Sequence, residues 1–285
     1  MEFFKGANGL AYLIGLLAVA MIIEAIMPWR HGVKIDLARW LRNASMAFYT
    51  MMIFTLLPVL ADYGGAVTAQ ARGIGLFNQI AAPIWPQLVF SVLALDLLTY
   101  GQHRATHKWY IFWRLHRVHH SDTHIDATTS LRFHPMETIA RAAVELPVIF
   151  LLGVPPEAIL LSFAIQTFSN TITHTNIALP RSMDRLAAGI FVTPHIHRLH
   201  HSTAPEHQYS NFGTIFTFWD RLFGTYCGPE NLRKNETFGI EGPEQMPRES
   251  FANLALDPFR TPERAAIPTP LHAAAARQES ASDDP

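Results

Sequence analysis

The sequence contains a single cysteine and few charged residues. Cys227 alone excludes an internal disulfide framework and a cysteine-ligated iron–sulfur cluster. Charged residues make up 16% of the chain, well below the roughly 25% of a typical soluble domain. The formal net charge is −1, whereas nucleic-acid binding calls for a basic face. The composition therefore predicts no nucleic-acid partner.

The hydrophobic residues, 49% of the chain, collect in long runs. A bilayer-crossing helix needs about 20 apolar residues, and three runs approach that length: Leu10–Met27, Ala44–Ala61 and Ile84–Gly101. No small-residue cleavage site follows the first run, so we interpret it as a span and not as a signal peptide.

A further pair of apolar runs is interrupted by Pro155-Pro156-Glu157. Its halves, Ala142–Val154 and Ala158–Ile172, are short for spanning and predict a helical hairpin that dips into or just crosses the membrane. The alternative is a soluble helical protein with a buried hairpin. The apolar blocks before residue 173 leave little polar face for water, which favours a membrane protein.

The cations predict the orientation. By the predicted spans, 20 of the 22 lysines and arginines fall on one side, which the positive-inside rule assigns to the cytoplasm. We expect a bacterial inner membrane or the endoplasmic reticulum. We divide the chain into N-terminal transmembrane helices (1–83), a histidine-rich catalytic domain (84–260) and a disordered tail (261–285).

Histidine is the one residue type in marked excess. Thirteen of the 15 histidines lie in two windows, His103–His134 and His174–His207, where even scatter would place roughly 3.5. His31 and His272 lie outside both windows, and we interpret them as ordinary surface or core residues.

The spacing of these histidines predicts metal ligands. His103 and His107 continue from the third span at i and i+4, so both rings share one helix face. Two H-x-x-H-H motifs follow, at 116–120 and 197–201. In each, i with i+3 and i+4 should form one coordinating face, while the adjacent histidines diverge toward two metals. His174, at the end of the apolar hairpin, could join them at the same depth.

The number of histidines predicts two ions. A closed tetrahedral zinc site uses four ligands, whereas eight or nine histidines suit two ions with four to five nitrogens each. We expect iron, with zinc possible in purified material, because two adjacent irons can use O₂ to break an unactivated C–H bond. The fold class we predict is all-α, a multi-pass transmembrane bundle with a cytoplasmic, histidine-rich di-metal cap.

Polar residues near these motifs are candidates for supporting roles. Asp96, seven residues before His103 and on the same helix face, could accept the second ring N–H of a ligand, or bond to Thr99 or Tyr100. Glu137, with His134, could line a substrate entrance or tether the hairpin, or simply cap a helix start. Asn211 and Asp220 are plausible outer acceptors, although Asp220-Arg221 could be a structural ion pair.

Other polar residues stay open. His124 and His207 could belong to the metal site or lie outside it. The basic residues Arg104, Lys108, Arg114 and Arg117 could hold lipid phosphates or an acidic electron donor, or be solvated surface charge.

The motif order resembles the fatty acid hydroxylase/sterol desaturase superfamily. It runs from Asp96 to Tyr226 as H-x-x-x-H, H-x-x-H-H, F-H-P-M-E, T-H-T-N, H-x-x-H-H and W-D-R-L-F-G-T-Y. The resemblance implies a membrane enzyme whose non-haem di-metal centre uses O₂ and two electrons on lipids. It places the ligands on His103, His107, His116, His119, His120, His197, His200 and His201, with His174 as a ninth. Where some members have a further histidine, this chain has Asn170, and His195 could substitute.

We therefore predict hydroxylation of a C–H bond in a fatty acyl, sterol or related membrane lipid. Desaturation on the same scaffold is the alternative within the superfamily. A haem- or metal-binding transport protein is the alternative from another class, but the predicted spans contain no histidine to hold a haem. No haem-domain, flavin or nicotinamide motif is present, so electrons should come from a separate donor, cytochrome b5-like or ferredoxin-like.

Overall fold

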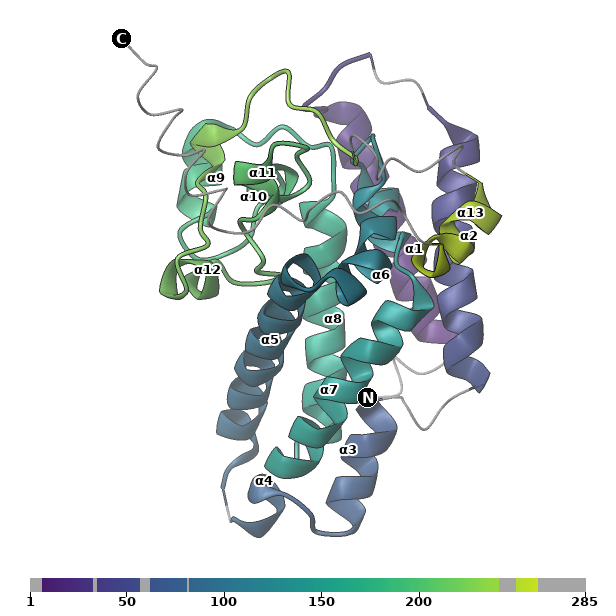
Figure 1. The fold of residues 1–285 in the computed structure, drawn as a ribbon. Helices are drawn as coiled ribbons and strands as arrows, with labels where there is room; N and C mark the ends of the chain where they lie inside the picture. The colour runs from purple at the N-terminus through teal and green to yellow at the C-terminus, as the bar shows by residue number, and fades with distance from the viewer. Residues whose placement is uncertain (1–6, 33–34, 57–61, 81, 241–249, 261–285) are drawn as a thin grey trace.

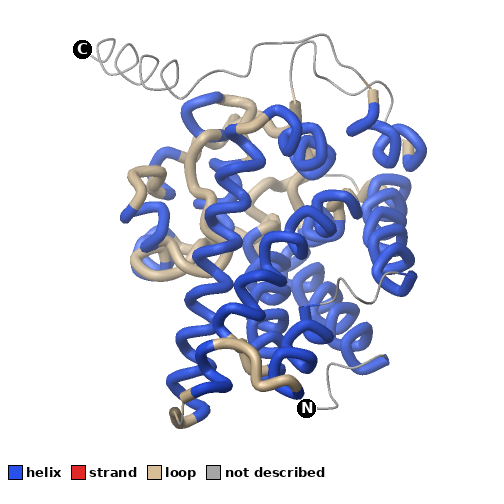
Figure 2. Tube along the Cα trace, turned by 60° about the horizontal axis from the view of Figure 1, so that its bottom comes forward, coloured by secondary structure: helices blue, strands red, loops and turns tan. Residues whose placement is uncertain are grey.

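The computed structural model describes residues 7–32, 35–56, 62–80, 82–240 and 250–260. These residues form helices and loops, and the only β-pairing among them is three isolated bridges. Figure 2 shows the same composition, helix and loop without a strand. The prediction of an all-α fold is confirmed.

Long helices form a bundle that makes up most of the molecule (Figure 1). Helix α8 is central, since both α1 and α5 pack against it, while α7 contacts α2 and α5. Their bounds are α1 Ala7–Ile26, α2 Leu37–Leu56, α5 Ile84–Lys108, α7 Pro135–Leu152 and α8 Pro156–Thr173.

The predicted hairpin is present as α7 and α8. Each helix has proline at its first position, where the missing N–H costs no hydrogen bond. Gly153 ends α7 with a φ of 65°, a left-handed conformation that glycine adopts without steric cost. The backbone of Gly75 lies so close that a Cβ there would come within 2.1 Å of the Gly153 nitrogen.

Helices α3 (Asp62–Ala71) and α4 (Leu76–Gln79) close the end of the bundle near this turn (Figure 1). The sequence does not predict α3, because Gly64-Gly65 lowers its helix propensity. Packing against α7 and α8 stabilises it instead. A Cβ on Gly65 would lie 2.6 Å from the Leu146 Cδ2 atom, so the small residue permits the close approach.

Two helices are long and apolar enough to cross a membrane, judged by length and composition alone. They are Gly9–Ile26 of α1 and Ile84–Lys108, the whole of α5. The predicted second span falls in α2, which carries Arg39 and Arg42 in its first turns and does not meet this criterion; residues 57–61 lie outside the described part. Two of the three predicted spans are thus supported in the described residues.

Shorter helices and loops form a cap on the opposite end of α5 and α8 from α4 (Figure 1). The backbone of Trp109 is extended, which ends α5 and separates it from α6. Helix α6 then turns back and packs against α5. The cap contains α6 Tyr110–His120, η3 Ala127–Leu131, α9 Arg181–Ala187, α10 Pro194–His200, α11 Pro205–Gln208, α12 Phe218–Leu222, η4 Pro229–Asn231, α13 Phe251–Leu256 and η6 Asp257–Phe259.

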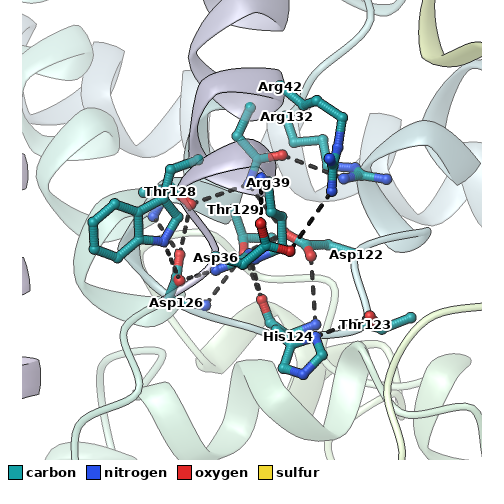
Figure 3. Close-up of polar contacts among 12 residues, drawn as sticks. Asp36, Arg39, Arg42, Asp122, Thr123, His124, Asp126, Thr128, Thr129 and Arg132 are labelled. Carbon is teal, nitrogen blue, oxygen red and sulfur yellow. Dashed lines mark hydrogen bonds and ion pairs between the residues drawn. The ribbon is translucent and has the colours of Figure 1, made fainter. Parts of the chain in front are cut away.

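A buried ion network joins α2 to the turn that follows α6 (Figure 3). The Arg39 guanidinium donates to Asp122 Oδ2 at 2.8 Å and to the His124 carbonyl at 2.7 Å, and it also pairs with Asp126. Asn43 Nδ2 donates to the same Asp122 oxygen at 3.1 Å. Arg39 is one of the 20 cations from which the cytoplasmic side was predicted, but it is 4% exposed and joins the cap to α2.

Arg117 is likewise structural. Its Nε and Nη2 atoms donate to both carboxylate oxygens of Asp257, at 2.6 and 2.8 Å, and both side chains are buried. The prediction that Arg117 could meet a lipid phosphate or an electron donor is therefore wrong. The ion pair instead anchors η6 to the outer side of α6.

Candidate metal centre

Nine histidines from four parts of the fold converge where the cap meets the ends of α5 and α8. Within each of two groups, one ring nitrogen per histidine lies within 4.8 Å of all the others. Group A comprises His103, His107, His116, His120 and His200, and group B comprises His119, His174, His197 and His201. Every member except His103 is buried. All nine are the histidines that the sequence predicted as ligands.

Each H-x-x-H-H motif divides between the groups. His116 and His120, at i and i+4 on α6, belong to group A, and His119 between them belongs to group B. In the second motif His197 and His201 belong to group B, and His200 to group A. Adjacent histidines do diverge, as predicted. The expectation that i, i+3 and i+4 form one face is wrong, because the i+3 ring points to the other group.

The ring nitrogens of group B have the spacing of ligands around one ion. His174 Nε2 lies 3.0 Å from His119 Nε2, 2.9 Å from His197 Nε2 and 3.2 Å from His201 Nε2. Four nitrogens placed tetrahedrally ~2.0–2.1 Å from a divalent ion would be about 3.3 Å apart. The observed separations are close to that value.

Hydrogen bonds among these rings cannot account for the arrangement. The His174 Nδ1 atom lies 2.6 Å from the Asn170 carbonyl and must carry the proton. Its Nε2 atom therefore carries one lone pair and no proton, yet the Nε2 atoms of three other histidines lie within hydrogen-bond distance of it. The Nδ1 atoms of His119, His197 and His201 are buried without a hydrogen-bond partner among the described residues. A metal ion bound to the four Nε2 atoms of group B would satisfy their lone pairs together, so the residues present fit a metal.

Group A shows the same organisation with more outer support. His103 Nδ1 donates to the Phe212 carbonyl at 2.9 Å, and His200 Nδ1 donates to the Ser210 carbonyl at 2.8 Å. His116 Nδ1 lies 2.8 Å from Glu137 Oε1. Such contacts fix the tautomer and leave Nε2 free for a metal. Accordingly, Nε2 of His103 lies 3.1 Å from that of His116, and Nε2 of His120 lies 3.1 Å from that of His200.

Burial lowers the pKa of several histidines in the two groups. Desolvation and the neighbouring imidazoles lower the pKa of His119, His197 and His201 well below the usual value. Burial also lowers the pKa of His200 to about 3 and of His174 to about 4. Because a lowered histidine pKa disfavours the protonated ring, these rings present lone pairs at neutral pH.

Of the supporting residues, Glu137 is the one that touches a group histidine, His116. Asp220 acts one peptide away: it accepts the Phe212 and Gly213 N–H groups at 2.8 Å each, and the Phe212 carbonyl holds His103. The anticipated Asp220–Arg221 pair does not form, since Arg221 donates to the Ala188 carbonyl.

Asp96 and Asn211 have structural partners. Asp96 accepts Trp219 Nε1 at 2.9 Å and the Ile215 N–H at 3.3 Å, so neither a ligand ring nor Thr99 or Tyr100 is its partner. It ties α5 to the loop that carries Phe212. Asn211 has a positive φ of 58° and exchanges hydrogen bonds with the Cys227 backbone.

The remaining histidines lie outside both groups. His195 pairs with Asp184 at 3.3 Å and does not substitute for the histidine missing at Asn170. His207 bonds Glu236 and His124 contacts Thr123. His134 is the N-cap of α7. His31 lines a separate cavity, and His272 is outside the described residues.

Three orienting groups were missed by the sequence analysis because they are backbone carbonyls. Those of Phe212, Ser210 and Asn170 accept from His103, His200 and His174. Carbonyls carry no residue-type signal. The position of Asn170, one turn before His174, is the only feature from which one could have been inferred.

The chain was compared with known proteins. A family model described as fatty acid hydroxylase matches residues 88–225, a range that contains all nine histidines. An ornithine lipid hydroxylase of Rhizobium tropici is 31% identical over 239 residues, which cover 80% of this chain and 70% of that protein. No solved structure matches the chain.

More distant relatives share shorter segments. An alkylglycerol monooxygenase of Caenorhabditis elegans is 30% identical over 138 residues, covering 48% of this chain and 26% of that protein. A sphinganine C4-monooxygenase of Arabidopsis thaliana is 27% identical over 158 residues, covering 54% and 59%. The family model, the similarity to the ornithine lipid hydroxylase over 80% of this chain and the two histidine groups agree with one another. The chain therefore belongs to the fatty acid hydroxylase family of membrane-associated oxidoreductases.

Proposed function

We propose that this protein hydroxylates a C–H bond of a membrane lipid, using two iron ions and O₂. The observation that carries the proposal is the pair of histidine groups, buried except for His103, in which the ring nitrogens converge. The relatives that act on ornithine lipid, alkylglycerol and sphinganine support a lipid substrate.

Group A would hold one ion through five imidazoles and group B the second through four. When bound, an iron pair supplies the oxidising power that C–H cleavage with O₂ requires. Five nitrogens exceed the closed tetrahedron of structural zinc, which supports iron. Cys227 belongs to neither group, so the first shell is expected to contain nitrogen and no sulfur.

The protein's own contribution is orientation and exclusion of water. Glu137 and the Phe212, Ser210 and Asn170 carbonyls each hold one Nδ1–H, so the rings cannot rotate away when a ligand exchanges. Phe133 stacks on His119 with ring centroids 4.2 Å apart, and Trp113 lies beside His107 at 5.1 Å. These apolar rings shield the groups from bulk solvent.

We also propose that the cap faces the cytoplasm, where a separate cytochrome b5-like or ferredoxin-like protein reduces it. The cation distribution supports this side. Exposed Arg104 and Lys108, at the cap end of α5, are suited to an acidic donor. Cysteine at exposed Glu230 should resist a membrane-impermeant label in intact cells. Labelling there from outside would refute the orientation.

The reaction is tested by supplying ¹⁸O₂ to cells or purified protein and analysing lipids by mass spectrometry. Hydroxylation incorporates one oxygen atom of O₂ into the lipid and reduces the other to water, so the product should carry one ¹⁸O atom. An unlabelled product lacking two hydrogens would show desaturation instead. A new hydroxyl whose oxygen comes from water would refute the oxygenase proposal.

A further inference from the structure

A cavity of about 330 Å³ lies where α1 leaves the bundle, outside both histidine groups. Its size falls in the lower part of the ~300–1,000 Å³ range of small-molecule sites. The end of α1 from Met21, residues 28–32 and Ile35 contribute to its lining, as do His124 and Asp126 of the ion network (Figure 3). The lining also includes two arginines, a glutamate and three aromatic residues: Arg30, Arg198, Glu24, Trp29, Trp40 and Phe238.

Arg198 is an incompletely satisfied buried cation in this lining. It is 1% exposed, and its Nη2 atom donates to the Thr175 and Ile177 carbonyls at 2.6 and 2.7 Å. Its Nε and Nη1 atoms have no hydrogen-bond partner within the described residues. A buried guanidinium lacking an ion-pair partner is costly, and a bound anion would offset that cost.

A second guanidinium reinforces the positive charge. Arg30 lies over the rings of Trp29 and Phe238, at 4.9 and 4.8 Å from their centroids, and donates to the Glu236 carbonyl. Arg198 also lies over the Trp29 ring, with its guanidinium carbon 4.7 Å from the ring centroid. Both arginines therefore contact the same tryptophan. Within the described chain, neither arginine forms an ion pair with a carboxylate.

The acidic residues of the lining do not neutralise both arginines. Asp126 already pairs with Arg39 and accepts Trp40 Nε1. Glu24 accepts the backbone N–H groups of Ala127 and Asn176. Glu24 and Asp184 act on Arg198 electrostatically, and Glu236 acts on Arg30, but among the described residues none of them forms an ion pair with these arginines. The Nε and Nη1 atoms of Arg198 therefore remain available to an anion.

We propose that this cavity binds the anionic head group of a membrane lipid, as a site distinct from the metal centre. The phosphate would meet Arg198 and Arg30, and the aromatic wall would cover the adjoining glycerol. The lipid chains would follow α1, a candidate span whose Ile22 and Ile26 are 59% and 72% exposed. This inference does not depend on the reaction performed at the histidines.

The test is calorimetric titration of the full-length protein in neutral detergent with short-chain phosphatidylglycerol. Phosphatidylcholine of the same chains, in which choline offsets the phosphate charge, is the lipid control, and inorganic phosphate is the free-anion control. Arg30→Gln and Arg198→Gln are the test variants. Arg72→Gln removes one charge from an exposed position after α3 and is the matched protein control.

We expect saturable binding of phosphatidylglycerol that weakens about tenfold or more in Arg30→Gln and Arg198→Gln and is unchanged in Arg72→Gln. Arg30 is a half-buried loop residue, so its variant keeps the test valid if Arg198→Gln fails to fold. Equal binding of the two lipids, or an equal loss in Arg72→Gln, would overturn the site. Inorganic phosphate binding as tightly as the lipid would overturn its assignment to a lipid.

Discussion

Alanine at His119 or at His120 is expected to abolish lipid hydroxylation. The two residues are adjacent on α6 and equally buried, at 2% and 0% exposure, so the two variants carry similar folding costs. They belong to different groups, however, His119 to group B and His120 to group A. Each variant should therefore lose metal from a different ion site while the other site keeps all its ligands.

The matched control for this pair is His207→Ala. His207 is also buried, at 5% exposure, but it bonds Glu236 and belongs to neither group. Metal analysis should give two ions per chain for His207→Ala and fewer for the other two variants, with helical content by circular dichroism unchanged in all three. Full activity in His119→Ala or His120→Ala, or equal metal loss in His207→Ala, would contradict the assignment.

Methionine at Arg39 is expected to lower the free energy of unfolding by about 3–5 kcal/mol. The change leaves the Asp122 and Asp126 carboxylates beside each other without their shared cation, and Asp122 is fully buried. Since domains are stable by only ~5–15 kcal/mol, much of the protein should unfold on mild heating in detergent. The turn after His120 would be released first.

Arg42→Met is the control for this measurement. Arg42 lies three residues further along α2, and its ion pair with half-exposed Asp36 is long, at 3.9 Å. Such a pair contributes about 0–1 kcal/mol. A thermal unfolding curve for Arg39→Met that matches that of Arg42→Met would show that the buried network does not stabilise the cap.

The sequence predicted several features that depend on local geometry, although it misplaced the i+3 histidine of each H-x-x-H-H motif. The i, i+4 spacing of His103 and His107 on one helix is sufficient to place both in group A. Pro155-Pro156 likewise begins α8 because of proline's own backbone restrictions, after Gly153 has ended α7. The selection of the nine histidines that the structure brings together in two groups needed only the motif spacing and the family resemblance.

Features that depend on contacts between distant segments could not be predicted. The Asp96 carboxylate meets Trp219 across 123 residues, and no spacing rule reaches that far. Arg39 reads as a loop cation in the sequence because nothing local reveals its partners Asp122 and Asp126. The same limitation hid α3, whose helix depends on packing against α7.

The most direct test of the di-metal assignment is metal analysis of the purified wild-type protein combined with X-ray absorption spectroscopy. The two histidine groups predict two metal ions per chain, iron in active material, with a first shell that contains nitrogen from histidine and no sulfur. One ion per chain, or a sulfur shell from Cys227, would contradict it.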